Sequence, residues 1–143
     1  MKGVFYTLLL FLFMINCKKD KIDAQPDEIM KPLVGKWYLT EVEQIVNGEK
    51  VWVPFAGYEA IYTNFRFDGV ELYENGKASC CAPKTYYINN TRYEVVPKKE
   101  VSYSFDCSLV DCMPCPSYTI EVNGNQMMIA RCSSARSKYL RAE

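Results

Sequence analysis

One β-prone stretch decides the fold of this chain: Leu33-Val34-Gly35-Lys36-Trp37-Tyr38-Leu39-Thr40-Glu41-Val42-Glu43. A glycine, one further residue and a tryptophan open the first long run of β-branched and aromatic residues, which favours an extended strand. Leu39 and Val42 have opposite parity in this run, so we expect a bulge or a strong bend within the strand. A targeting segment and a linker are expected before the stretch, and a series of short strands after it.

The composition limits the classes of function. The 143 residues suit a single domain. The chain has no histidine, which removes the commonest general base and the commonest metal ligand. Lys+Arg and Asp+Glu both number 17, so no net charge attracts nucleic acid. Glycine-rich phosphate loops and nucleophile elbows are also missing from the sequence. We therefore expect neither an enzyme, nor a cofactor, nor a nucleic-acid partner.

Residues 1–16 are predicted to be a lipoprotein signal peptide. Lys2 supplies the positive end, and the apolar run over residues 4–15 is too short to span a hydrocarbon core about 30 Å thick. Cys17 stands where this run stops, and the Met14-Ile15-Asn16-Cys17 sequence resembles a bacterial lipobox. The resemblance implies cleavage before Cys17 and attachment of acyl chains to it. Each buried CH2 contributes about 0.8 kcal/mol, so several chains, palmitate among them, would form a stable membrane anchor.

Residues 17–32 are expected to be the lipidated cysteine and a flexible polar linker, because lysines and acidic residues alternate there with few apolar ones. The lysine at position 18 resembles the second mature residue of lipoproteins that are sent to the outer membrane. The expected location is therefore the outer membrane, at its periplasmic face or at the cell surface.

Residues 33–143 are expected to fold as one all-β domain. Turn signals recur along them: Asn47-Gly48, Asp68-Gly69, Asn75-Gly76, Asn89-Asn90, Pro97-Lys98 and Asn123-Gly124. Between the turns, apolar and polar residues alternate over residues 61–67, 101–107 and 117–122. A period of two is typical of a sheet with one wet face. Sequential short hairpins favour an antiparallel up-and-down β-barrel of about eight short strands.

The strand at Gly35-x-Trp37 resembles the opening of the lipocalin fold, and the chain is similar to lipocalin-like outer-membrane lipoproteins of the Bacteroidetes group. The resemblance extends to a late hairpin over residues 118–129 and to a final strand over residues 137–141. It implies that Trp37 plugs one end of the barrel beneath an arginine near the C-terminus. Arg141 is the first candidate for this arginine and Arg131 the second.

The cysteines indicate an exported protein. Of the 7 cysteines, six remain after Cys17: Cys80, Cys81, Cys107, Cys112, Cys115 and Cys132. An even number in an exported chain predicts disulfides, with 15 possible pairings. The Cys112-Met113-Pro114-Cys115 sequence is similar to a redox pair, but no βαβ pattern surrounds it. The adjacent Cys80 and Cys81 make a poor second arm for zinc. Structural disulfides are favoured, and their connectivity stays open.

Two functions remain compatible with these features. In the first, a non-catalytic, lipid-anchored barrel binds a small apolar ligand, as the family resemblance implies. In the second, a disulfide-stabilised module inhibits an envelope enzyme or joins a surface complex, with the cysteine-rich loop over residues 108–116 as its contact. A cavity with apolar walls favours the ligand, whereas a filled interior and an exposed apolar loop favour the protein partner.

The anchor leads to a first prediction. The Cys17→Ala change should abolish incorporation of labelled fatty acid and leave the precursor uncleaved, because the thiol is the acylation site. Metabolic labelling and membrane fractionation measure both effects. A variant that still incorporates label and fractionates with the outer membrane would show that the lipobox assignment is wrong.

Overall fold

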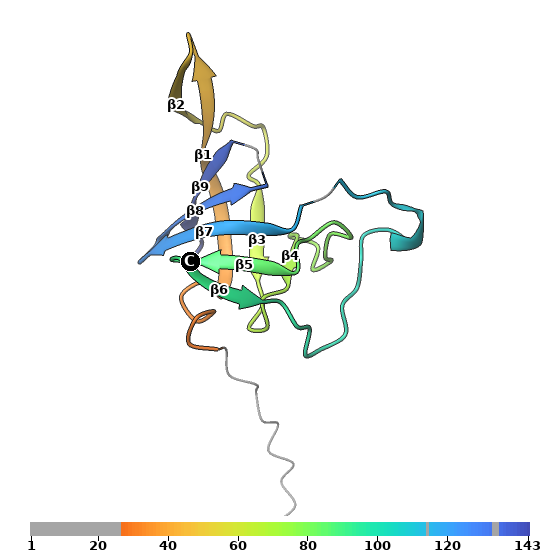
Figure 1. Ribbon diagram of the computed structural model, residues 1–143. Coiled ribbons are helices and arrows are strands. Elements are labelled where there is room, and N and C mark those ends of the chain that lie inside the picture. Colours follow the sequence, from red (N-terminus) through yellow and green to blue (C-terminus); the bar gives the residue numbers. More distant parts are fainter. Residues whose placement is uncertain (1–26, 114, 133–134) are drawn as a thin grey trace, which may run out of the picture.

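The computed structural model describes residues 27–113, 115–132 and 135–143, and almost all of its regular structure is strand (Figure 1). The strands are β1 (Gly35–Val46), β2 (Glu49–Pro54), β3 (Tyr62–Phe65), β4 (Glu71–Leu72), β5 (Thr85–Ile88), β6 (Thr91–Glu94), β7 (Ser117–Asn123), β8 (Gln126–Arg131) and β9 (Arg136–Arg141). A short 3-10 turn, η2 (Cys107–Leu109), lies in the loop between β6 and β7. The all-β class expected from the sequence is confirmed. Cys17 and the signal peptide over residues 1–16 lie outside the described residues.

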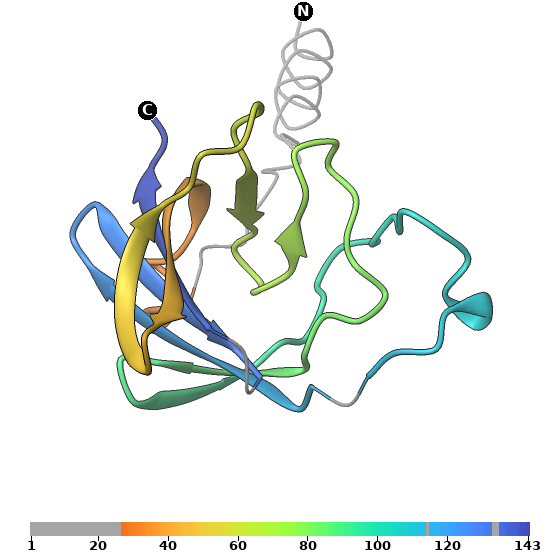
Figure 2. The same ribbon diagram turned by 90° about the horizontal axis from the view of Figure 1, so that it is seen from above.

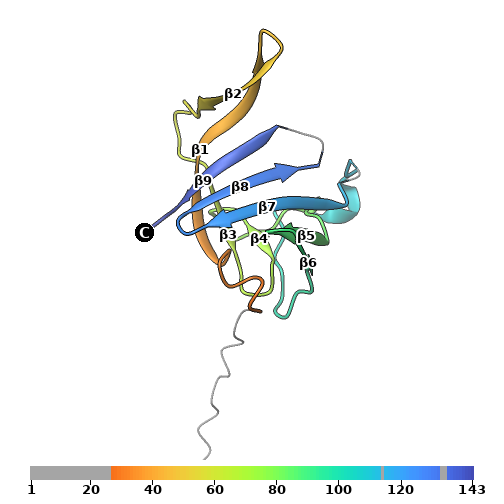
Figure 3. The same cartoon turned by 60° about the vertical axis from the view of Figure 1, so that its left-hand side comes forward.

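The strands form one curled sheet in the order β4-β3-β1-β9-β8-β7-β5-β6, with β2 paired to the C-terminal half of β1. Viewed from above, the sheet curls around the core as a half-barrel (Figure 2). Strands β7, β8 and β9 lie side by side, and the β1–β2 hairpin projects beyond them (Figure 3). Asn47 and Gly48 form the expected turn of this hairpin, with φ values of 52° and 85°.

A strictly antiparallel up-and-down order is not confirmed, because β5 and β7 pair in parallel, with Tyr86 opposite Tyr118. The expected strand over residues 101–107 is wrong: this segment forms a loop whose Tyr103 makes one isolated bridge to Ala78. Its alternating sequence does not reflect a buried face, since Phe105 is exposed. The loop carries the chain back from β6 to the start of β7, as a parallel pair requires a long connection.

Strand β1 is the central element, since it pairs with β2, β3 and β9. The expected irregularity is present: the register with β9 shifts between Leu39 and Glu41, so Thr40 is the extra residue of a β-bulge. The Thr40 hydroxyl donates a hydrogen bond to the Lys138 carbonyl oxygen at 3.1 Å. The bulge bends β1, which allows one strand to serve both the half-barrel and the projecting hairpin.

The core lies on the concave face of the sheet. The alternation of β7 is confirmed, because Tyr118, Ile120 and Val122 are buried and the residues between them are not. The other large side chains of the core are Met30, Leu33, Trp37, Phe65, Tyr86, Ile88, Met127, Ile129 and Tyr139.

The predicted linker over residues 17–32 extends too far, because its last residues belong to the packed domain. Residues 27–33 form successive turns, in which the Met30 and Lys31 N–H groups both donate to the Asp27 carbonyl oxygen. Met30 and Leu33 are fully buried. Two apolar side chains three positions apart lie on one face of a turn, and here that face covers one end of the half-barrel. The packed domain therefore begins before residue 33.

Where the structure describes the chain, one side of the half-barrel has no strand ladder and is open in this sense. Among the described residues, β4 and β6 are the two edges of the sheet, and no pairing joins them. The hydrogen bonds of Arg66 and Asp68, which we call the polar clamp, connect the two edges instead. Arg66 donates two hydrogen bonds to Asp68, at 2.8 and 2.7 Å. It donates two more to the carbonyl oxygens of residues 99 and 100. The Asp68 carboxylate also accepts the Lys98 N–H at 2.7 Å. The clamp joins the β3–β4 turn to the chain that follows β6.

The Asp68 carboxylate is fully buried, and burial alone would raise its pKa. The hydrogen bonds from Arg66 and from the Lys98 N–H outweigh burial, so the pKa lies below its usual value. The folded protein therefore holds fewer protons at this site than the unfolded chain. The stabilisation is complete above the unfolded pKa of about 3.9 and is lost as the pH falls through the lower folded value.

The clamp predicts an acid-sensitive fold. The Asp68→Asn change should lower the free energy of unfolding at pH 7 by about 3 kcal/mol, because Arg66 loses its buried counter-ion. It should also remove part of the stability loss of the wild-type protein below about pH 4. Denaturant unfolding between neutral and acid pH measures both, with the exposed Asp111→Asn as the control. An Asp68→Asn variant with the wild-type pH slope would contradict this account of the clamp.

Candidate functional site

A polar cluster lies inside the half-barrel, where four strands meet. Arg131 of β8 donates a hydrogen bond to Glu71 of β4 at 2.6 Å and another to the Tyr139 hydroxyl of β9 at 2.9 Å. The Thr63 hydroxyl of β3 donates to the same Glu71 oxygen, Oε1, at 2.8 Å. The guanidinium lies 5.3 Å from the ring centroid of Tyr118. These side chains connect the β4–β3 edge of the sheet with its middle strands, β9 and β8.

The charge of Arg131 is retained despite its burial. Burial alone would lower the pKa of the guanidinium, but the Glu71 carboxylate and the Tyr139 hydroxyl raise it above its usual value. Buried ion pairs contribute little net stability, because desolvation of both charges offsets their attraction. A cluster of this kind is therefore a candidate site as well as a structural element.

Tyr86 of β5 adds a hydroxyl to this region. Its ring is 0% exposed, stacks on Tyr118 at 5.9 Å and meets the edge of Phe65 at 5.9 Å. The hydroxyl has no hydrogen-bond partner among the described residues. Burial, and then the nearby Glu71 carboxylate, raise the pKa of this phenol well above its usual value, so it stays protonated. An orphaned buried hydroxyl is unusual and needs an explanation.

A pocket of about 220 Å³ lies at the open side of the half-barrel, next to this cluster. Glu71 and Tyr86 line it together with a set of mostly apolar residues: Val70, Ala78, Ala82, Pro83, Val95, Pro97 and Val101. Ser79, Cys80, Lys84 and Tyr103 complete the lining. The pocket therefore combines apolar walls with two polar side chains of the core cluster.

The second region of interest is the loop over residues 101–113, which we call the docking loop. Two disulfides fix it to the segment before β5: Cys80–Cys107 and Cys81–Cys112. The third disulfide, Cys115–Cys132, joins the start of β7 to the end of β8. Asp106 caps the η2 turn, since its carboxylate accepts hydrogen bonds from the Ser108 N–H and hydroxyl, and these bonds lower its pKa. The loop projects from the side of the half-barrel (Figure 1).

The docking loop presents large apolar side chains to solvent. Phe105, Leu109 and Met113 are 76%, 84% and 86% exposed, and Tyr103 is half exposed beside them. The loop carries Asp106 and Asp111 and has no basic residue. Exposed apolar side chains on a covalently restrained loop are typical of an interaction surface.

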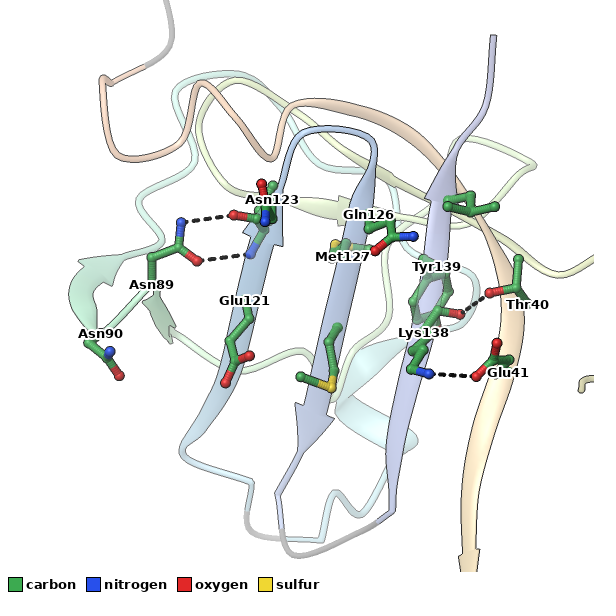
Figure 4. Close-up of a pocket in the computed structure, with 13 residues that line it drawn as sticks. Thr40, Glu41, Asn89, Asn90, Glu121, Asn123, Gln126, Met127, Lys138 and Tyr139 are labelled. Carbon is green, nitrogen blue, oxygen red and sulfur yellow. Dashed lines mark hydrogen bonds and ion pairs between the residues drawn. The ribbon is translucent and has the colours of Figure 1, made fainter. Parts of the chain in front are cut away.

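A third region is a pocket of about 540 Å³ over the face of β7, β8 and β9 that is turned away from the core. In register across this face lie Glu121, Met128, Lys138 and Glu41. Lys138 and Glu41 form an ion pair at 2.6 Å (Figure 4). At the other end, the Asn89 amide bonds to both backbone groups of Val122, which extends β7 pairing into the β5–β6 turn. The pocket offers polar contacts but no evident nucleophile.

The structure resolves the open question of cysteine pairing. All six domain cysteines form disulfides, and the adjacent Cys80 and Cys81 both reach the loop end of the sheet. Cys112 and Cys115 belong to different disulfides, so they do not form the redox pair that their spacing suggests. In the described part of the chain, no group of three or more histidine, cysteine or acidic side chains is arranged to hold a metal ion. Nor is any helix there long and apolar enough to cross a membrane.

The structure places Gly35, Trp37 and Arg141 together at one end of the half-barrel. The Arg141 guanidinium lies 4.2 Å from the ring centroid of Trp37, while Arg131 lies in the polar cluster instead. Gly35 has a φ of 121°, and a Cβ there would stand 3.1 Å from the Arg141 Nη1 atom. This close approach explains the glycine before the tryptophan.

The polar cluster was not found from the sequence. Glu71 belongs to a strand of two residues without a readable period, and Thr63 and Tyr86 resemble ordinary strand residues. An arginine within an apolar strand, such as Arg131 after Met127, Met128, Ile129 and Ala130, was the one available signal. Comparisons with protein-family models, curated proteins and solved structures gave no match for this chain.

The disulfides lead to a prediction about the stability of the domain and the protection of the docking loop. The paired change Cys81→Ala and Cys112→Ala should lower the free energy of unfolding by about 2–5 kcal/mol and make the docking loop more sensitive to proteases. Limited proteolysis with mass spectrometry measures loop cleavage. The purified mature domain without Cys17 should have a mass six hydrogens below that of its reduced form, since three disulfides are present. Two or more cysteines that react with an alkylating agent before reduction would contradict the pairing.

Proposed function

We propose that this chain is a non-catalytic recognition module, held at the outer membrane by acyl chains on Cys17, that binds a protein partner through its docking loop. The observation that supports this most strongly is the exposure of Phe105, Leu109 and Met113 on a loop fixed by two disulfides. The interior of the half-barrel is filled by large side chains, which favours an external contact over a wide internal cavity.

Restraint of the loop favours binding. A flexible segment loses conformational entropy when it docks, and about 0.5–1.5 kcal/mol is lost for each side chain that becomes ordered. The disulfides of Cys107 and Cys112 remove much of the backbone freedom before the partner arrives. Aromatic and methionine side chains are also enriched at the centres of protein interfaces. The loop thus has both the chemistry and the preorganisation of a contact element.

The charges of the loop indicate the chemistry of the partner. Asp106 and Asp111 lie among the exposed apolar side chains without any lysine or arginine in the loop. An anionic membrane surface would repel this segment. A protein with an apolar groove and a basic rim would complement it, and its association rate would fall with ionic strength.

The absence of catalysis is proposed from side-chain chemistry. The chain has no histidine, and its cysteines in the domain are paired in disulfides. Carboxylates that are buried, such as Asp68 and Glu43, are held by arginines rather than presented to a substrate. A lipocalin-like origin of the fold is also proposed: the Gly35-x-Trp37 opening of β1 and the stacking of Arg141 support it.

A second function, the binding of a small apolar ligand, is supported by the pocket at the open side of the half-barrel. Its volume of about 220 Å³ and its valine, proline and alanine walls suit a small molecule. Its walls include Tyr103 of the docking loop, so both functions would involve the same side of the protein.

Docking is tested by site-specific photocrosslinking in cells that express the full chain. A photoreactive residue at position 109 should give one discrete protein adduct, while the same residue at the exposed position 58, away from the loop, should give none. With the partner purified, the combined changes Phe105→Ser, Leu109→Ser and Met113→Ser should weaken binding at least about a hundredfold, since interface anchors cost 2 kcal/mol or more each. Unfolding of the triple variant should match wild type.

Two results would contradict docking through this loop. Adducts at position 109 that contain only lipid would place the loop in the membrane rather than on a protein. A purified partner that binds the triple variant as tightly as wild type would move the contact elsewhere, for instance to Ile45 of the β1–β2 hairpin, which is also exposed.

A further inference from the structure

A small pocket at the open side of the half-barrel lies next to a buried hydroxyl that has no hydrogen-bond partner within the described part of the chain. The pocket lies between the start of β4, the segment over residues 78–84 and the chain after β6. Valine, alanine and proline side chains form its walls, and Glu71 and Tyr86 bring the polar cluster of the core to its lining. It therefore leads from the side of the sheet to the cluster, rather than from the end of the half-barrel that Trp37 covers.

Tyr86 is one of the residues that line this pocket, and its buried hydroxyl has no hydrogen-bond partner among the described residues. The ring is held from two sides by Phe65 and Tyr118, so the hydroxyl cannot turn away to find a partner elsewhere. Nearly all buried hydroxyls in folded proteins have a hydrogen-bond partner. A ligand or a water in the pocket would supply the missing partner. Because the phenol stays protonated, it can both donate and accept a hydrogen bond.

The Glu71 carboxylate is the second polar group. Both hydrogen bonds that it accepts within the described residues, from Thr63 and Arg131, end on Oε1. Within the described residues the other oxygen, Oε2, accepts no hydrogen bond, and Glu71 belongs to the pocket lining. Arg131 balances the charge of Glu71, so the pair attracts neither a cation nor an anion strongly.

We propose that this pocket binds a small neutral ring compound with one hydroxyl group. The ring would contact the apolar walls, and the hydroxyl would accept a hydrogen bond from Tyr86 and donate one to Glu71. The volume of about 220 Å³ agrees with this size, since an apolar cavity of about 150 Å³ accommodates benzene. The proposal rests on the ligand-binding function and not on a protein partner, although Val101 and Tyr103 of the docking loop belong to the pocket lining.

Phenol and benzene are the probes that test this proposal, because they differ only in the hydroxyl. Each is titrated against the disulfide-intact chain over residues 18–143, and amide shifts in two-dimensional NMR report the affinity and place of binding. Phenol should bind about tenfold more tightly than benzene, which corresponds to one net hydrogen bond. Shifts should centre on Val70, Ala82 and Val95, which line the pocket.

Matched variants assign the effect to the hydroxyl. The Tyr86→Phe change should remove the preference for phenol and leave the affinity for benzene unchanged, and it should not destabilise the free protein. Tyr87→Phe is the control, because Tyr87 is the next residue of β5 and is 40% exposed. The Ala82→Phe change should fill the pocket and abolish the binding of both probes while the disulfides still form.

The possible outcomes distinguish recognition of the ligand's hydroxyl group from binding of a small molecule in the pocket. Equal affinity of wild type for phenol and benzene would overturn the proposed hydroxyl recognition but would leave small-molecule binding intact. Failure of both probes to shift the pocket residues would overturn both. Phenol preference that survives in Tyr86→Phe would show that another group recognises the hydroxyl, and the assignment to Tyr86 would be wrong.

Discussion

The contact between Trp37 and Arg141 joins the first strand to the last, and the rest of the fold depends on it. The indole N–H donates to the Leu33 carbonyl oxygen at 2.8 Å, and the Arg141 guanidinium donates to the Val34 carbonyl oxygen, also at 2.8 Å, and to that of Pro32. One stacked pair thus fixes the N-terminal turns, the first strand and the last strand. Since β1 also carries β2 and β3, its position determines half of the sheet.

The opposite side of the half-barrel depends on a different kind of bond. There the strands are short, so hydrogen bonds of the Arg66–Asp68 clamp and the disulfides of Cys80 and Cys81 replace a strand ladder. Side chains and loops fill this side of the half-barrel less completely than paired strands would, so space remains there for a pocket. The two regions proposed to bind a ligand or a partner, the pocket beside Tyr86 and the docking loop, lie where strand pairing ends.

Local signals allowed a good part of the fold to be predicted. Asn47-Gly48 formed its turn because both residues tolerate positive φ, and Leu39 and Val42 indicated the bulge because a strand has a strict period of two. Residues 101–107 also alternate between apolar and polar side chains but form a loop, because a strand also needs a neighbouring strand to pair with. The site around Glu71 and Tyr86 depends on contacts between distant strands, and single-strand patterns carry no information about such contacts.

A double-mutant cycle between Trp37 and Arg141 tests most directly whether this contact holds the fold together. Trp37→Ala should lower the free energy of unfolding by about 3–5 kcal/mol and Arg141→Ala by about 1–2 kcal/mol. The double variant should lose at least about 1 kcal/mol less than their sum, because each change already removes the shared contact. The Trp52 and Lys138 pair, a similar contact at 4.0 Å on the other face, is the control and should couple more weakly. Losses for Trp37 and Arg141 that add within about 0.3 kcal/mol would contradict the account.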